Sequence, residues 1–299
     1  MLKESLIKED ESFGGLYYSF LIIFIIAFSS IFAVFTASLN ANQVNDKAWY
    51  VLLSFSVGPL AIIVATLLFA WLRGDSLVKI CGWEKCSSKY YLIAVIAFIS
   101  VFFGLANLNT SFIDFLSKKF GYTASSMTLP TFSIINYILV IFAVCILPAV
   151  AEEVAMRGIV LRGVKSGNVI VNAVLGGLLF SLFHMSPMQT AYQFAVGFVF
   201  SLIAIRSGST VPTTIVHFLN NFAIVTIEYF SPKLFANLGG WMFAITIPAT
   251  ICLVLITVLL IADGDNKTEG SKQSLKNFFM YSIAGIFICT FMWTMSFLG

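Results

Sequence analysis

Charged residues are scarce in this chain of 299 residues. Asp, Glu, Lys and Arg make up 10% of the sequence, whereas an ordinary soluble domain carries about 25%. The 17 Lys and Arg residues are spread over the whole length and form no basic stripe, which excludes a nucleic-acid-binding protein. Hydrophobic residues make up 59% of the chain. This excludes a disordered chain and predicts a polytopic membrane protein.

Cysteine is also infrequent and its pattern excludes a secreted disulfide scaffold. The five cysteines are odd in number, and Cys145, Cys252 and Cys289 lie inside apolar runs, where cysteine usually packs as a small hydrophobic residue. Cys81 and Cys86 flank a polar segment with no histidine or second cysteine pair nearby. We interpret them as loop thiols of a reducing compartment rather than as a zinc site.

Nine apolar runs are long enough to be membrane-spanning helices, since a bilayer core needs about 20 mostly apolar residues. The runs are residues 16–38, 49–72, 90–113, 134–161, 169–186, 188–205, 212–230, 241–262 and 278–298. Only Ser186 and Pro187 separate the fifth run from the sixth, which predicts a tight helical hairpin or one broken helix. The sequence therefore predicts an all-α transmembrane helical bundle of eight to nine spans, with residues 1–299 as a single integral membrane domain.

Basic residues are distributed unequally between the two sides of this predicted topology. Twelve Lys and Arg residues fall on the side of the N-terminus and four on the other side. Because cytoplasmic loops carry the excess of Lys and Arg, the N-terminus is predicted to be cytoplasmic and, with nine spans, the C-terminus external. The chain carries no organelle signal that we recognise, and we expect it in a bacterial plasma membrane.

Three ionisable residues lie within six positions in the fourth run, at membrane depth, where each is costly. Glu153 and Arg157 are four residues apart on one helix face and are predicted to form a structural pair. Glu152 is rotated by about 100° from Glu153 and has no partner on its own helix, which predicts a reactive carboxylate. The alternative is that the span ends near Val150 and the charges mark its exit from the membrane.

Only two histidines are present, His184 and His217, and both lie inside predicted spans. One intramembrane histidine is often a hydrogen-bonding group between helices, but two together with a buried glutamate indicate a site. Asn221 lies one turn beyond His217 and Asn220 lies at i+3, so the spacing does not choose between these asparagines.

The segments EEVAMR (152–157), FSLFH (180–184) and HFLNN (217–221) resemble, in order, the EExxxR, FxxxH and HxxxN/D motifs of the CPBP family. This family comprises the type II CAAX prenyl endopeptidases and their bacterial relatives, the abortive-infection proteins. The resemblance implies an all-helical intramembrane protease with its site in a water-accessible cavity, and a catalytic core over residues 134–230. It also implies that Glu152 is the catalytic carboxylate, His184 its partner, and His217 and Asn221 the remaining site residues.

The chemistry of peptide hydrolysis accounts for these residue types. The reaction needs a water, a base that activates it, and donors for the developing oxyanion. We expect Glu152 to be the base, His184 to orient the water, and His217 and Asn221 to supply the donors. Ser181, one turn before His184, is the nearest alternative nucleophile.

A metal is the competing mechanism, and the sequence leaves it open. Glu152, His184 and His217 could form a ligand set of two imidazoles and one carboxylate, as in some catalytic zinc sites. Nothing resembles the HExxH motif, and Asn221 is a poor zinc ligand but a good oxyanion donor. We therefore favour a mechanism that needs no cofactor, with a divalent metal such as zinc as the alternative.

Two function classes fit the sequence. The first is an intramembrane endopeptidase that acts on a membrane-embedded or lipidated protein or peptide, in CAAX-type processing, peptide maturation or bacteriocin self-immunity. The second is a transporter, an immunity factor or a scaffold that uses the buried Glu and His as a proton relay. Broken helices in matching halves would favour a transporter, but Pro148 and Pro187 are not so placed. The expected partners are the substrate and the lipid bilayer; the sequence does not define the oligomeric state.

Overall fold

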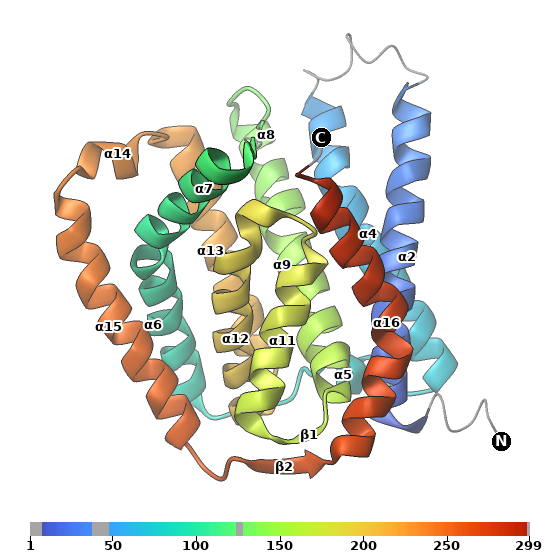
Figure 1. Ribbon diagram of the computed structural model, residues 1–299. Coiled ribbons are helices and arrows are strands. Elements are labelled where there is room, and N and C mark those ends of the chain that lie inside the picture. The colour runs from blue at the N-terminus through green and yellow to red at the C-terminus, as the bar shows by residue number, and fades with distance from the viewer. Residues whose placement is uncertain (1–7, 38–47, 124–127, 298–299) are drawn as a thin grey trace.

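Helices account for most of the computed structural model, which describes residues 8–37, 48–123 and 128–297. The helices outside the centre are α2 (Asp10–Ala37), α4 (Ala48–Arg73), α5 (Leu77–Cys81), α6 (Ser88–Gly104), α7 (Ala106–Phe120), α14 (Leu234–Leu238), α15 (Trp241–Ala262) and α16 (Lys272–Met295). The central helices are α8 (Ile134–Val140), α9 (Leu147–Glu153), α10 (Leu161–Gly163), α11 (Val169–Phe183), α12 (Thr190–Ser207) and α13 (Val211–Phe230). In Figure 1 the central helices lie between α6 and α15 on one side and α2, α4 and α16 on the other.

Each predicted apolar run overlaps a helix, but the predicted count of eight to nine spans is not confirmed. In the described part of the chain, six helices are long and apolar enough to cross a membrane, or up to seven if the bent pair α6 and α7 forms one span. Helix α11 has only 15 residues, which is about 22 Å at 1.5 Å per residue. Helix α13 has 20 residues, but His217, Asn220 and Asn221 interrupt its apolar composition. Residues 38 and 298, where two of the predicted runs end, lie outside the described residues.

The segment Ile134–Gly163 is one 30-residue apolar helix that contains two π-helical stretches. These are η1 (Ile141–Ile146), between α8 and α9, and η2 (Val154–Val160), between α9 and α10. Such π-helical insertions occur frequently at functional sites. Helix α9 ends at Glu153, so the two adjacent glutamates lie immediately before η2.

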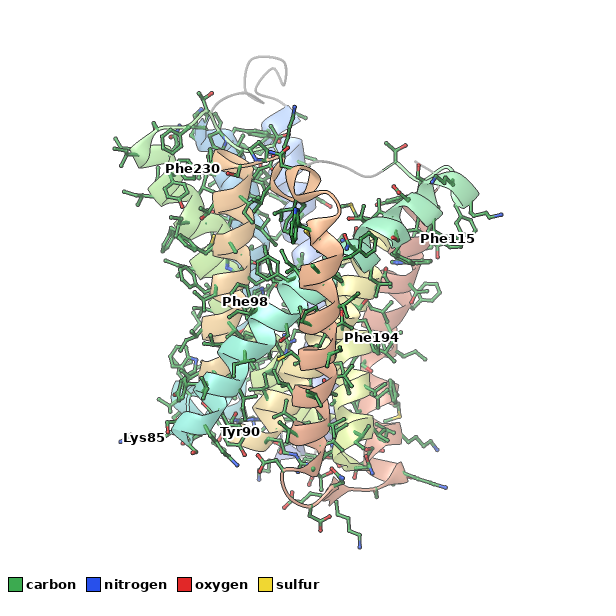
Figure 2. All side chains as sticks on the ribbon, turned by 90° about the vertical axis from the view of Figure 1, so that its left-hand side faces the viewer. Lys85, Tyr90, Phe98, Phe115, Phe194 and Phe230 are labelled. Atoms are coloured by element: carbon green, nitrogen blue, oxygen red, sulfur yellow. The ribbon has the colours of Figure 1, made fainter. Side chains whose placement is uncertain are left out.

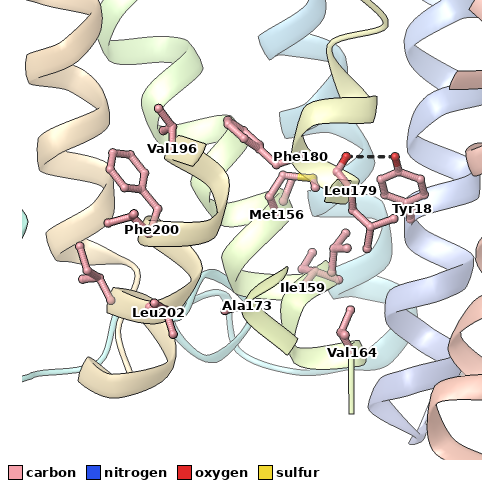
Figure 3. Packing of buried hydrophobic residues seen from close by; sticks show 14 of the residues in the cluster. Tyr18, Met156, Ile159, Val164, Ala173, Leu179, Phe180, Val196, Phe200 and Leu202 are labelled. Carbon is pink, nitrogen blue, oxygen red and sulfur yellow. Dashed lines mark hydrogen bonds between the residues drawn. The ribbon is translucent and has the colours of Figure 1, made fainter. Parts of the chain in front are cut away.

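Helices α11 and α12 form the predicted hairpin, joined by the short 3-10 helix η3 (Pro187–Gln189). Glycine permits their close approach: a Cβ added at Gly197 would lie 2.9 Å from the Cα of Gly177 and 3.1 Å from the ring of Phe180. In the core beside them, the Tyr18 hydroxyl donates to the Leu179 carbonyl oxygen at 3.2 Å (Figure 3). This packing fixes the end of α11, which carries His184 as its C-cap residue.

The outer surface of the bundle is apolar. Large hydrophobic side chains of α15 are exposed, including Phe243 at 66% and Leu259 at 64%. Figure 2 shows Phe98, Phe115 and Phe230 along this side of the molecule, with Lys85 and Tyr90 near one end. A broad exposed apolar surface of this kind suits contact with lipid.

A short two-stranded ribbon lies at one end of the bundle, so the fold is not purely helical. Strand β1 (Ser166–Asn168) pairs antiparallel with β2 (Lys267–Gly270). Basic side chains gather at the same end in ion pairs: Asp10 accepts from Arg73 at 2.5 Å and from Lys165 at 3.0 Å, and Lys89 pairs with Asp263 at 2.9 Å. Lys3 and Lys47, which entered the charge count, lie outside the described residues.

Candidate active site

Glu153 and Arg157 form a fully buried ion pair on successive turns of one helix. The Nη1 atom of Arg157 donates to Glu153 Oε1 at 2.7 Å, and the two side chains are 0% and 1% exposed. The guanidinium carbon also lies 4.2 Å from the centre of the Phe180 ring and 5.5 Å from that of Phe200. The pair neutralises both charges and is held by aromatic faces from α11 and α12.

The same carboxylate oxygen holds His217 of α13. The Nδ1 atom of His217 lies 2.9 Å from Glu153 Oε1. Because an ionised carboxylate only accepts hydrogen bonds, Nδ1 carries a proton and donates it. Glu153 thus sets the tautomer and the ring orientation of His217, and Nε2 faces away from this pair.

His184 is oriented by its own helix. Its Nδ1 atom donates to the Phe180 carbonyl oxygen at 2.8 Å, which leaves Nε2 as the free ring nitrogen of the neutral imidazole. Met185 follows with a φ of 49°, a left-handed conformation that is uncommon outside glycine. Met185 follows the C-cap of α11, and the chain then turns into η3 and α12.

The Glu152 carboxylate lies close to the Nε2 atoms of both His184 and His217. Its Oε2 atom is 3.9 Å from His184 Nε2 and 3.9 Å from His217 Nε2. Within the described part of the chain, Oε2 is buried and makes no hydrogen bond. The Glu152 side chain remains 15% exposed. A water molecule that bridges Glu152 to either imidazole would satisfy this carboxylate, because 3.9 Å is too long for a direct hydrogen bond.

The two asparagines belong to one hydrogen-bond chain. The Tyr192 hydroxyl of α12 donates to Asn220 Oδ1 at 2.8 Å, and Asn220 Nδ2 donates to Asn221 Oδ1 at 3.4 Å. Asn221 Nδ2 then donates to the Val144 carbonyl oxygen in η1 at 3.2 Å. The chain orients both amides and leaves Asn221 with one further N–H to offer.

The Ser181 hydroxyl makes its hydrogen bond to a group other than His184. Its hydroxyl donates to the Thr190 carbonyl oxygen at 2.9 Å and is buried. A serine nucleophile needs a base within hydrogen-bond reach. The hydrogen bond to Thr190 instead ties α11 to the start of α12.

The donor types of the site suit zinc, and their separations are longer than a bound zinc ion would set. In a tetrahedral zinc site, ligand distances of 2.0–2.2 Å put neighbouring ligand atoms about 3.3–3.6 Å apart, and the Nε2 to Oε2 separations are 3.9 Å. Among the residues that the structure describes, no group of three or more His, Cys, Asp or Glu side chains is arranged to hold a metal ion.

Four contacts of the site are not indicated by the sequence motifs. The carbonyl groups of Phe180 and Val144 orient His184 and Asn221 through the backbone, which side-chain identity does not reveal. The contact between His217 and Glu153 joins residues 64 positions apart. The hydrogen bond from the Tyr192 hydroxyl to Asn220 joins residues 28 positions apart.

Comparisons with known proteins place the three motifs in one family domain. A search of curated proteins finds no match. The family model described as type II CAAX prenyl endopeptidase Rce1-like matches residues 134–223. This range includes Glu152, His184, His217 and Asn221 and begins with α8. The match supports a CAAX-type intramembrane protease at the level of the family. Residues 134–223 of this membrane protein therefore resemble the Rce1-like type II CAAX prenyl endopeptidase family.

Proposed function

We propose that the chain is an intramembrane endopeptidase that hydrolyses a peptide bond in a membrane-embedded or lipidated protein. One observation carries the proposal: Glu152 Oε2, buried and without a hydrogen bond among the described residues, lies 3.9 Å from Nε2 of both histidines. This arrangement suits a water molecule that gives a proton to Glu152 and attacks a peptide carbonyl. The family match to residues 134–223 supports the same reaction class.

In the first step Glu152 takes a proton from the bridging water, and the water oxygen forms a bond to the carbonyl carbon. His184, whose Nδ1 is fixed by the Phe180 carbonyl, uses Nε2 to accept the second water proton in a hydrogen bond. This hydrogen bond orients the water so that a lone pair of its oxygen points toward the carbonyl carbon. The carbonyl oxygen becomes an oxyanion that needs donors.

We assign one oxyanion donor to His217 in the state with a proton on both ring nitrogens, the Nε2 proton being taken from solvent before the substrate binds. Its Nδ1–H is held by Glu153 Oε1 at 2.9 Å, so the added charge lies beside a carboxylate that stabilises it. Arg157 keeps Glu153 ionised through the pair at 2.7 Å. Asn221 contributes its remaining N–H. Collapse of the tetrahedral intermediate breaks the C–N bond, and the protonated Glu152 returns its proton to the leaving nitrogen.

The steps described here need no metal. We infer that the substrate reaches the site from the bilayer, since Glu152 and the histidines lie on central helices. We also propose a bacterial plasma membrane with the N-terminus cytoplasmic and, with nine spans, the C-terminus external. The charge asymmetry of the sequence supports this orientation.

The test is N-terminal peptide mass spectrometry on membranes and medium of cells that lack the protein. The cells are complemented at equal abundance with wild type, Glu152→Gln or Glu228→Gln. Glu228 is an exposed carboxylate on α13 and serves as the matched control. We expect new termini with wild type and Glu228→Gln only. Identical termini for wild type and Glu152→Gln would contradict the proposal, and a phenotype lost without any cleavage difference would indicate proton-coupled transport.

A further inference from the structure

A cavity of about 260 Å³ lies at the end of the molecule that carries β1 and β2. Its walls come from the helix end at residues 157–165, the α12–α13 connection and β2. Arg157, Arg162 and Lys165 line it together with the hydroxyl residues Ser209 and Thr268. Protein pockets for drug-sized ligands have volumes of about 300–1,000 Å³, so this cavity suits a smaller group.

The charge of the lining is strongly positive. Glu269 is its only carboxylate within the described residues, and that side chain is 93% exposed at the rim. Burial alone lowers the pKa of Lys165, but the hydrogen bond and the charge of Asp10 raise it above its usual range overall. Lys165 therefore stays protonated, and its Nζ, 3.0 Å from Asp10, has further protons to donate.

Arg157 provides a donor without a partner. Its Nη1 atom pairs with Glu153, but Nη2 is buried and makes no hydrogen bond to any residue that the structure describes. The residue as a whole is 2% exposed. An unpaired guanidinium nitrogen in a buried position is unusual and calls for an acceptor.

The remaining donors are held in place by the surrounding backbone. Arg162 Nη1 donates to the Lys79 carbonyl oxygen at 2.6 Å, which fixes a guanidinium that has four other N–H groups. Ser209 Oγ accepts from the Val211 N–H at 3.2 Å, so its own proton is available to donate. Donors fixed in this way lose little freedom when an anion binds.

We propose that this cavity binds a phosphate-class anion, with Arg157, Arg162 and Lys165 as its ligands and Ser209 as a further donor. Arginine and lysine are the side chains that recognise phosphate oxygens. The phosphate could come from a phospholipid headgroup or from the free ion. The site shares Arg157 with the proposed peptidase site, but its test measures anion binding and requires no substrate.

The test uses the purified full-length chain in detergent. Native mass spectrometry compares retained phosphatidylglycerol with phosphatidylcholine, and thermal shift compares inorganic phosphate with chloride at matched ionic strength. We expect Lys165→Gln to weaken anion binding about tenfold, the change that corresponds to about 1.4 kcal/mol. Lys165→Arg should retain binding. Lys89→Gln removes a cation from the same end without touching the cavity and is the matched control.

Lys165→Gln also loses the ion pair with Asp10 and could misfold for that reason. A second variant therefore tests the cavity without removing this ion pair. Thr268→Glu places a carboxylate in the cavity wall and should abolish binding by repulsion. Preference for phosphatidylglycerol without a phosphate effect would support a lipid headgroup, and a phosphate effect alone would support the free ion. The proposal fails if wild type binds neither phosphatidylglycerol nor inorganic phosphate. It also fails if Thr268→Glu and Lys165→Gln bind these two ligands as wild type does.

Discussion

Glu152 and Glu153 are neighbours in the chain but have different surroundings. Glu153 Oε1 accepts hydrogen bonds from Arg157 and His217, so its charge is compensated and its position is fixed. Glu152 Oε2 faces two imidazole nitrogens at 3.9 Å and holds no hydrogen bond among the described residues. Glu153 therefore positions the site, and Glu152 is available to react.

At the residue scale, the buried pair predicts a large loss of stability on mutation. Arg157→Gln leaves Glu153 as a buried, partly uncompensated charge, and we expect it to lower the free energy of unfolding by about 3–5 kcal/mol. The control is Lys79→Gln, which breaks a pair with the same i,i+4 spacing to Asp75. Because the Lys79 side chain is 60% exposed, this loss should be about 0–1 kcal/mol. Thermal denaturation in detergent measures both, and equal losses would contradict the prediction.

The asparagine pair gives a second prediction at this scale. If Asn221 donates to the oxyanion, Asn221→Ala should lower the rate of substrate cleavage by about 100- to 1,000-fold with little change in KM. Asn220→Ala removes a residue that Tyr192 holds and should cost less than Asn221→Ala. The measurement is the initial rate at which the termini specific to wild type appear. A larger effect at Asn220 would assign the donor to that residue instead.

At the scale of elements, the position of His184 depends on how closely α11 packs on α12. Gly197→Ala would place a Cβ 2.9 Å from the Gly177 Cα and 3.1 Å from Phe180. We expect overpacking to cost about 1–3 kcal/mol and to lower activity by displacing Phe180, whose carbonyl orients His184. Gly58→Ala is the control, since no atom lies within 4 Å of the added Cβ. Unchanged melting and cleavage in Gly197→Ala would refute this coupling.

The connection between α15 and β2 has a predicted pH dependence. Hydrogen bonds from Lys89 and Tyr90 hold the pKa of Asp263 below its usual range. A lowered pKa in the folded state contributes stability that is present above the unfolded value of about 3.9 and is lost as pH falls through the folded pKa. Wild type should therefore exceed Asp263→Asn in melting temperature at pH 7, and the difference should shrink below about pH 4. A difference that stays constant from pH 7 to pH 3 would contradict this assignment.

At the scale of the whole molecule, hydropathy located the helices because lipid-facing helices must be apolar along their length. The predicted eight to nine spans are not confirmed at two helices of the described part of the chain, where the composition or the length of the helix fails the test for a span. Helix α13 carries polar site residues, and α11 has only 15 residues and packs closely against α12. Spacing along one helix predicted that Glu153 and Arg157 could pair. The contact of His217 with Glu153 depends on how separate helices pack. The spacing of residues along a single sequence does not predict such a contact.

The proposed metal-free mechanism predicts how the intact protein responds to chelators. Cleavage in washed membranes should be unchanged after incubation with EDTA or 1,10-phenanthroline and should not rise on addition of zinc. The control is a zinc peptidase assayed in the same membranes, which must lose its activity. Loss of cleavage that added zinc restores would assign Glu152, His184 and His217 to a metal instead.

The central claim is that Glu152 activates the water that hydrolyses the peptide bond. Its most direct measurement is the cleavage rate of purified protein in lipid vesicles, with a peptide that spans the terminus found in cells. The account predicts that Glu152→Gln melts within a few degrees of wild type, because its Oε2 makes no hydrogen bond among the described residues. It also predicts a rate at least about 1,000-fold lower. A correctly folded Glu152→Gln that cleaves at a rate near wild type would contradict the account.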